Sequence, residues 1–198
     1  MDTHTENLLI KDISHDPEAF GMLFDYYYPM ILRYCLRRTG KVSIAEDLTS
    51  ETFMKAFKKI ESYQVRNVRI SAWFYAIANN EIKMYFRKNS LSTLSLEALY
   101  EEAGYEPLSS QDILEETLEA EREIERNEQF LKAQKILQSM PIKYQEVISL
   151  RYFEGKKIKE ISQILEKSDG TIKSLISRGV KNLTKKMNEG TNATKIGF

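Results

Sequence analysis

Residues 157–187, KIKEISQILEKSDGTIKSLISRGVKNLTKKM, decide the fold of the C-terminal part of the chain. The first third places isoleucine and leucine on one helical face, which predicts a short helix over Ile158–Leu165. A two-residue connection follows. The hydroxyl of Ser168 is then expected to cap a second helix over Gly170–Met187. The stretch therefore predicts two helices joined by a tight turn.

The second helix of this pair divides into two faces at 3.6 residues per turn. Its apolar face holds Ile172, Leu175, Ile176, Gly179, Val180, Leu183 and Met187. The candidate DNA contacts lie at its start and along the polar side: Ser168, Thr171, Lys173, Ser174, Ser177, Arg178, Lys181 and Lys185. Ser, Thr, Arg and Lys are the side chains that a helix-turn-helix presents to base edges and phosphates. An ordinary amphipathic hairpin with a solvated basic face would show the same spacing.

The N-terminal half reads as helical almost throughout, with no run of alternating polarity that indicates a strand. We expect three helices there, at Glu18–Thr39, Ile44–Ile60 and Ala72–Lys88. Gly40 is expected to end the first, and Pro29 to kink or break it near Tyr28. Ser43 and Ser71 are the expected N-caps of the second and third.

The middle of the chain differs from both ends in charge. Residues 91–128 carry 2 Lys/Arg against 12 Asp/Glu, a net of −10, whereas residues 141–198 carry 12 against 6. Further helices are expected over Asp112–Gln138 and from Pro141 to Gly155. The predicted fold is all-α, with two small helical domains joined by an acidic linker. The expected divisions are residues 1–90, the linker 91–128, a helix-turn-helix domain 129–188, and a tail 189–198.

The predicted helix Ile44–Ile60 has a polar side that contains one exposed methionine. That side consists of Asp47, Ser50, Glu51, Met54 and Lys58, while Ala45, Leu48, Phe53, Ala56, Phe57 and Ile60 are expected to face inward. Methionine adapts to apolar docking, so this side is a candidate partner surface. An ordinary solvated face is the alternative.

The predicted helix Ala72–Lys88 is apolar around most of its circumference. Its narrow polar stripe consists of Asn79, Asn80, Lys83 and Arg87, followed by Lys88. Amide and basic groups beside apolar walls suit an unstacked nucleic-acid strand. The loop before this helix, with Arg66, Asn67 and Arg69, is the expected place for a flipped base, and Trp73 is expected in the core.

Three stretches resemble bacterial sigma factors. Residues 137–183 (LQSMPIKYQEVISLRYFEGKKIKEISQILEKSDGTIKSLISRGVKNL) resemble the fourth sigma domain, with Glu166 in place of the usual small turn residue and Leu175 in place of an arginine. Residues 44–60 (IAEDLTSETFMKAFKKI) resemble the polymerase-binding helix of the second sigma domain, and residues 72–88 (AWFYAIANNEIKMYFRK) its promoter-opening helix. Their order, with no third domain between them, is that of the extracytoplasmic-function group.

The resemblance implies a transcription initiation factor that binds bacterial core RNA polymerase and promoter DNA. The Ile44–Ile60 surface would bind the polymerase, the Ala72–Lys88 stripe and preceding loop would hold the opened minus-ten strand, and the last helix would read the minus-thirty-five duplex. An anti-sigma factor is a further partner that the family implies. In this family the corresponding segment threads the RNA path of the polymerase, and we state as a hypothesis that the acidic linker mimics nucleic acid there; a disordered, solvated spacer is the alternative.

The remaining residues set limits on other functions. Cys35 permits no internal disulfide and is expected in the core, while His4 and His15 have no spacing for a zinc site. No catalytic constellation, cofactor site or membrane-length apolar run is found, and the N-terminus does not read as a secretory signal, so we expect a cytoplasmic protein that is not an enzyme. The rival function is a helix-turn-helix regulator that binds duplex DNA without polymerase.

Overall fold

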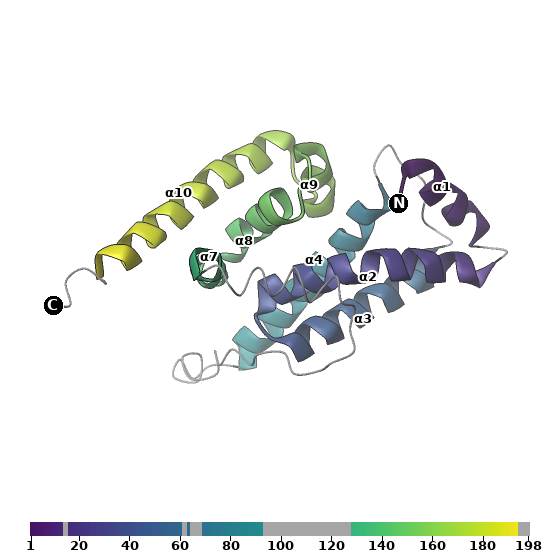
Figure 1. Ribbon diagram of the computed structural model, residues 1–198, viewed down its shortest axis with the longest axis horizontal. Helices are drawn as coiled ribbons and strands as arrows, with labels where there is room; N and C mark the ends of the chain where they lie inside the picture. The colour runs from purple at the N-terminus through teal and green to yellow at the C-terminus, as the bar shows by residue number, and fades with distance from the viewer. Residues whose placement is uncertain (14–15, 61–62, 64–68, 93–127, 194–198) are drawn as a thin grey trace. The chain divides into compact units, whose positions relative to one another are not determined.

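The structure is a computed structural model, and it describes residues 1–13, 16–60, 63, 69–92 and 128–193 (Figure 1). Every regular element in these ranges is a helix, which confirms the all-α prediction. The helices are α1 (Thr3–Asp12), α2 (Pro17–Thr39), α3 (Val42–Lys59), α4 (Ile70–Ser92), α7 (Glu128–Gln138), α8 (Ile142–Ile148), the π-helical turn η2 (Ser149–Phe153), α9 (Ile158–Leu165) and α10 (Asp169–Ala193). The expected acidic linker lies almost wholly outside the described residues, as does most of the helix expected over 112–138.

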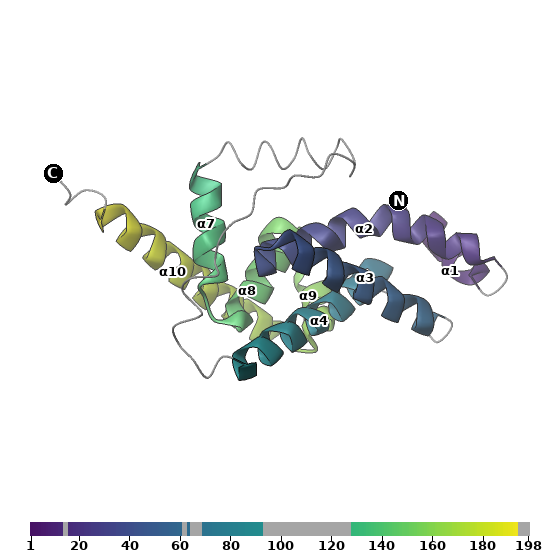
Figure 2. The ribbon, with the colours of Figure 1, turned by 90° about the horizontal axis from the view of Figure 1, so that it is seen from below.

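The chain forms two compact units, of which the first contains α1 to α4. Its helices α2, α3 and α4 pack on one another and lie side by side in Figure 1 and Figure 2. The rings of Phe53 and Phe74 lie 5.2 Å apart, and each contacts an aromatic ring of α2, Phe24 at 4.9 Å and Tyr27 at 5.3 Å respectively. Aromatic rings at such separations add to the stability gained from apolar burial. The core of this unit is therefore an aromatic cluster to which all three helices contribute.

The helix α2 follows the sequence prediction closely. Gly40 ends it with a left-handed backbone (φ 74°), and its N–H donates to the Leu36 carbonyl at 2.8 Å. Cys35 is buried, as expected. α2 continues through Pro29 as a single helix, so a break near Tyr28 is not found.

Two expected N-caps are wrong. Ser43 lies inside the first turn of α3, whose N-cap is Lys41 and has no side-chain cap bond. Ser71 lies inside α4, which begins one residue earlier at Ile70, and it is buried. In the first case the helix begins before the serine without any side-chain cap. In the second, packing of the helix start draws the serine into the interior.

The second unit contains α7, α8, η2 and α10. α10 packs against both α8 and α7. A Cβ at Gly179 would lie 3.0 Å from the Ile148 Cδ1 and 3.5 Å from the Tyr144 Cβ, so α10 needs a small residue where it meets α8. The segment from Pro141 ends near Gly155 as expected, but its second part is the wider turn η2, after which Gly155 has a left-handed backbone (φ 61°).

The helix α9 has the bounds that the sequence predicts. Its apolar residues Ile161, Ile164 and Leu165 are buried. Glu166 follows with φ 53°, the only left-handed residue other than glycine among the described residues. Left-handed backbone is costly for a residue with a Cβ, so Glu166 adopts here a conformation that glycine would adopt with less strain.

Candidate functional site

The start of α10 has the predicted cap. The Oγ of Ser168 accepts a hydrogen bond from the N–H of Thr171 at 3.2 Å and lies 2.9 Å from the Thr171 hydroxyl. The Ser168 carbonyl accepts from Ile172 N–H at 3.0 Å. These bonds satisfy donors that a helix start otherwise leaves without partners. The left-handed turn at Glu166 and this cap together fix where α10 begins.

The polar side of α10 faces solvent. Of the eight candidate DNA contacts, Ser174 is half-buried and the others are exposed: Ser168, Thr171, Lys173, Ser177, Arg178, Lys181 and Lys185. Ile172 and Gly179, on the opposite side, are buried. The Arg178 Nη2 donates to the Ser174 Oγ at 2.6 Å, which links side chains on adjacent turns. The predicted separation into two faces is confirmed, and α10 presents a continuous surface of hydroxyl and cationic groups.

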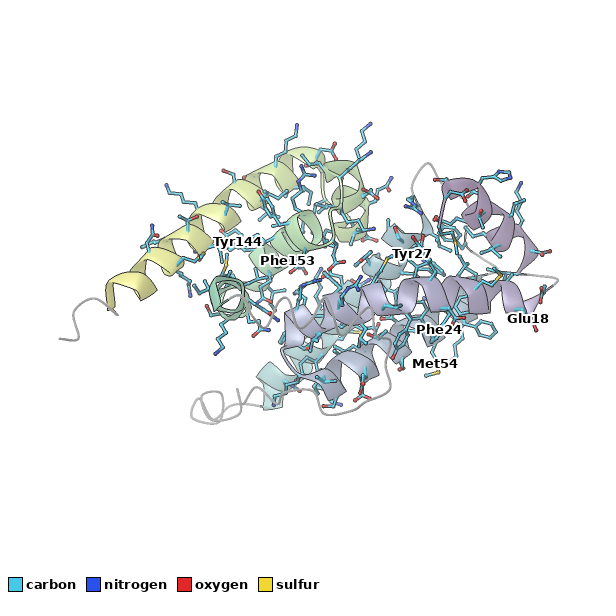
Figure 3. The ribbon with its side chains drawn as sticks, viewed as in Figure 1. Glu18, Phe24, Tyr27, Met54, Tyr144 and Phe153 are labelled. Carbon is cyan, nitrogen blue, oxygen red and sulfur yellow. The ribbon has the colours of Figure 1, made fainter. Side chains whose placement is uncertain are left out.

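The polar side of α3 also lies where the sequence predicts. Asp47, Ser50, Met54 and Lys58 are exposed, and Met54 keeps 53% of its surface accessible, projecting from α3 in Figure 3. Glu51 is half-exposed and pairs with Lys55 at 3.2 Å. Lys55 also donates to Glu81 of α4 at 2.6 Å, and these hydrogen bonds, that to Glu81 first, raise the pKa of Lys55. The polar side of α3 therefore lies on a helix that is linked to α4 by the Lys55–Glu81 ion pair.

Phe57 was expected to face inward, and that expectation is wrong. It is 54% exposed, because it lies near the end of α3 and only one side of its ring packs edge-on against Phe20 of α2, with centroids 5.0 Å apart. Spacings of four, three, four and three residues place Ser43, Asp47, Ser50, Met54 and Phe57 along one stripe, and all are exposed. That periodicity could have identified Phe57 as a surface residue.

The polar stripe of α4 divides between the two sides of the helix. Asn80, Arg87 and Lys88 are exposed and Lys83 is half-buried. Asn79 is fully buried (0% exposed), so the expectation that it faces outward with them is wrong.

Asn79 is buried because α2 supplies partners for its amide. The Asn79 Oδ1 accepts from Tyr34 Oη and from Arg38 Nη1, each at 3.1 Å, and Arg38 Nη1 also donates to Tyr34 Oη at 2.9 Å. A buried polar group retained with hydrogen-bond partners is structural in this position. We therefore leave Asn79 out of the nucleic-acid surface.

The loop before α4 is described only in part. Arg66 and Asn67 lie outside the described residues. Arg69 is exposed, and its guanidinium pairs with Glu6 of α1 through Nε at 3.2 Å and Nη2 at 3.0 Å. Trp73 is half-buried between the rings of Tyr63 at 4.9 Å and Phe74 at 5.7 Å.

The described ranges hold neither a metal-ligand cluster nor a helix suited to span a membrane. Among these residues no three His, Cys, Asp or Glu side chains come together in a way that could hold a metal ion. No described helix combines the length and apolarity that a membrane crossing requires.

Comparisons with known proteins agree with this arrangement. The family description "Sigma-70 region 2" matches residues 23–91, and "Sigma-70, region 4" matches residues 130–183. The first range contains the α3 and α4 surfaces, and the second contains the α10 surface except Lys185. The fold and its surfaces therefore define an RNA polymerase sigma factor.

Comparison with individual relatives identifies the group of sigma factors to which the chain belongs. The chain is 34% identical to the ECF RNA polymerase sigma factor SigW of Bacillus subtilis, over 88% of this chain and 91% of SigW. It is 29% identical to the ECF RNA polymerase sigma factor BldN of Streptomyces coelicolor, over 86% of this chain but only 61% of BldN. The sigma factor RpoE of Bartonella quintana, solved with the anti-sigma factor NepR, has a similar fold (TM-score 0.64, 22% identity, 85% of this chain and 96% of RpoE). The chain belongs to the ECF group of RNA polymerase sigma factors, which are promoter-specific transcription initiation factors.

Proposed function

We propose that this chain binds bacterial core RNA polymerase through the exposed stripe of α3 and directs it to promoters with minus-ten and minus-thirty-five elements. The observation that carries the proposal is the separation of three surfaces on regions of the sigma type. One is the α3 stripe around Met54, and the others are the amide and basic residues of α4 and the cationic side of α10.

The α3 stripe has the composition of a docking surface. Met54 and Phe57 expose apolar area toward its C-terminal end, with Asp47 before them and Lys58 after them supplying charge. Buried apolar anchors surrounded by polar groups are typical of residues that dominate the energy of an interface. We assign Asp47, Ser50, Glu51, Met54, Phe57 and Lys58 to the polymerase contact.

The two nucleic-acid surfaces suit different substrates. On α4, Asn80, Lys83, Arg87 and Lys88 lie on a helix with aromatic neighbours, which fits an opened strand of the minus-ten element. On α10, hydroxyl and cationic groups follow one side of a capped helix, which fits the major groove of the minus-thirty-five duplex. Arg66, Asn67 and Arg69 complete the proposed contacts to the opened strand. Nucleotidyl transfer is left to the polymerase, so the chain itself is not an enzyme.

Partners and location follow from this function. We propose an anti-sigma factor as a further partner, which would cover the surfaces that face the polymerase. The similar sigma factor RpoE was solved in complex with the anti-sigma factor NepR. Work with the polymerase places the protein in the cytoplasm. We propose residues 1–90 and 129–188 as the two functional domains, residues 91–128 as the linker between them and residues 189–198 as a tail. A helix-turn-helix regulator acting without polymerase is not favoured, because it leaves the α3 stripe without a role.

The polymerase contact is tested by measuring the affinity of the protein for core polymerase. Met54→Glu places a charge in the apolar part of the stripe and is expected to weaken binding at least tenfold. Met22→Glu is the matched control, because Met22 on α2 is 55% exposed and lies outside the stripe. Equal binding by the two variants would contradict the assignment of this surface.

A further inference from the structure

The N-terminal helix α1 packs on α2 and places one carboxylate in the interior of its unit. Asp2 caps the helix, and hydrogen bonds from Thr5 and from the N–H of His4 lower the pKa of Asp2 to about 2. One turn later, Glu6 is only 1% exposed although it is an acidic residue. Burial of a carboxylate is costly unless it is paired, so its partners determine what this helix is for.

Glu6 accepts four hydrogen bonds that come from two other helices and from the residue before one of them. Its Oε2 accepts from the Tyr27 hydroxyl of α2 at 2.7 Å and from the two nitrogens of Arg69, Nη2 and Nε. Its Oε1 accepts from the N–H of Ile70, the first residue of α4, at 2.8 Å. Burial, followed by the bond to Glu6, raises the pKa of Tyr27, so its hydroxyl stays a donor. Figure 3 labels Tyr27 on α2.

This arrangement fixes the guanidinium of Arg69 in one plane. Nε and Nη2 both donate to the carboxylate, and Nη2 also donates to the Met1 carbonyl at 2.6 Å. Both nitrogens donate to the same oxygen, Oε2, so this two-point pair consists of charge-assisted hydrogen bonds that orient the guanidinium. The described residues offer no acceptor to Nη1, and 42% of the side chain stays exposed. Part of the Arg69 side chain is therefore accessible to a ligand that accepts hydrogen bonds.

We propose that Glu6 is a positioning residue for promoter opening, which holds Arg69 so that its Nη1 meets a phosphate of the opened strand. The same carboxylate holds the start of α4, the helix that carries Asn80, Arg87 and Lys88. This inference rests on the proposed function, and it assigns to α1 a part in DNA capture rather than in polymerase binding. A partner with the charge of phosphate fits because guanidinium and phosphate match in geometry and charge.

The test uses full-length protein with core polymerase on a promoter duplex, and measures the rate of strand opening by permanganate reactivity of thymines. Glu6→Gln removes the charge that orients Arg69 and is expected to slow opening about tenfold to hundredfold, the range for a lost hydrogen bond to a charged group. Arg69→Gln should slow opening as much and reduce the salt dependence of promoter binding by about one unit of slope. The double variant should be no slower than Arg69→Gln alone, because Glu6 acts through Arg69.

The controls separate positioning from loss of fold. Asp12→Asn removes one exposed charge from the same helix and should open DNA as the wild type does. Core affinity and thermal unfolding are measured for each variant. If Glu6→Gln does not fold, Arg69→Lys keeps the charge without the two-point pair and should still slow opening at least fivefold.

Several results would overturn the inference. The first is strand opening at the wild-type rate by Glu6→Gln or by Arg69→Lys. The second is a double variant whose effects on the opening rate add. The third is faster opening by Glu6→Gln, which would mean that Glu6 keeps Arg69 away from DNA. Failure of the wild type to bind core polymerase or to open any promoter would instead contradict the proposed function.

Discussion

α4 and α10 carry similar side chains and use them differently. Each has a stripe of amide, hydroxyl and basic residues. On α10 none of the eight candidate contacts is buried, whereas on α4 Asn79 is fully buried and Asn80, the next residue, is exposed. The partners of Asn79 are Tyr34 and Arg38 of α2, which lie 45 and 41 residues earlier in the chain. A polar stripe thus indicates a surface only where no neighbouring helix supplies hydrogen-bond partners.

Alanine substitutions at Asn79 and Asn80 test this comparison between buried and exposed polar residues, and they have the largest expected effect. Asn79→Ala leaves the Tyr34 hydroxyl and the buried Arg38 without one shared acceptor, so we expect a loss of about 3 kcal/mol in the free energy of unfolding. Asn80→Ala should change it by less than about 0.5 kcal/mol, as exposed substitutions usually do. Urea unfolding of the two variants checks this. Similar losses in both would show that the buried network does not stabilise α4.

The next effect concerns the packing of α10 on α8. Gly179→Leu introduces a side chain where even a Cβ would lie 3.0 Å from Ile148, and overpacking of this kind costs about 1–3 kcal/mol. Gly170→Leu, in the first turn of the same helix, has no atom within 4 Å of the added Cβ and should not destabilise the protein. Thermal unfolding distinguishes them. A destabilised Gly170→Leu with an unaffected Gly179→Leu would mean that α10 packs through another face.

The smallest expected effect is on the exposed side of α10. Lys181→Ala should reduce the salt dependence of promoter binding by the holoenzyme by about one unit of slope, because one phosphate contact is lost. Lys186→Ala is the matched control, since its Nζ donates to Ser139 beside α7 at 3.1 Å. Affinities measured at four salt concentrations give both slopes. Equal salt-dependence slopes for Lys181→Ala and Lys186→Ala would contradict the assignment of the Lys181 side of α10 to DNA.

Much of the fold and of the candidate surfaces could be predicted from helical periodicity and from capping residues. The bounds of α9, the Gly40 end of α2, the Ser168 cap and the two faces of α10 follow from residues close together in sequence. The α3 stripe was also predicted, except for Ser43, which was expected as a cap, and Phe57, which the spacing of the stripe could have identified.

The features that the sequence did not predict depend on contacts between residues far apart in the chain. α1 was not predicted because its short polar sequence gives a weak signal, and Glu6 is buried only by pairing with Tyr27, Arg69 and Ile70. The burial of Asn79 and Ser71 has the same origin, since packing between helices overrides the local preference for exposure. Such pairings are not visible in spacing or composition.

The central claim is that this chain directs core polymerase to promoters. Its most direct test is run-off transcription with bacterial core polymerase on promoter fragments from the protein's own genome. We expect transcripts that require the protein, and that are lost when Asp47 and Met54 are both replaced but kept when Met22 is replaced. Tight binding of promoter duplex by the protein alone, without core association or transcript, would contradict the account.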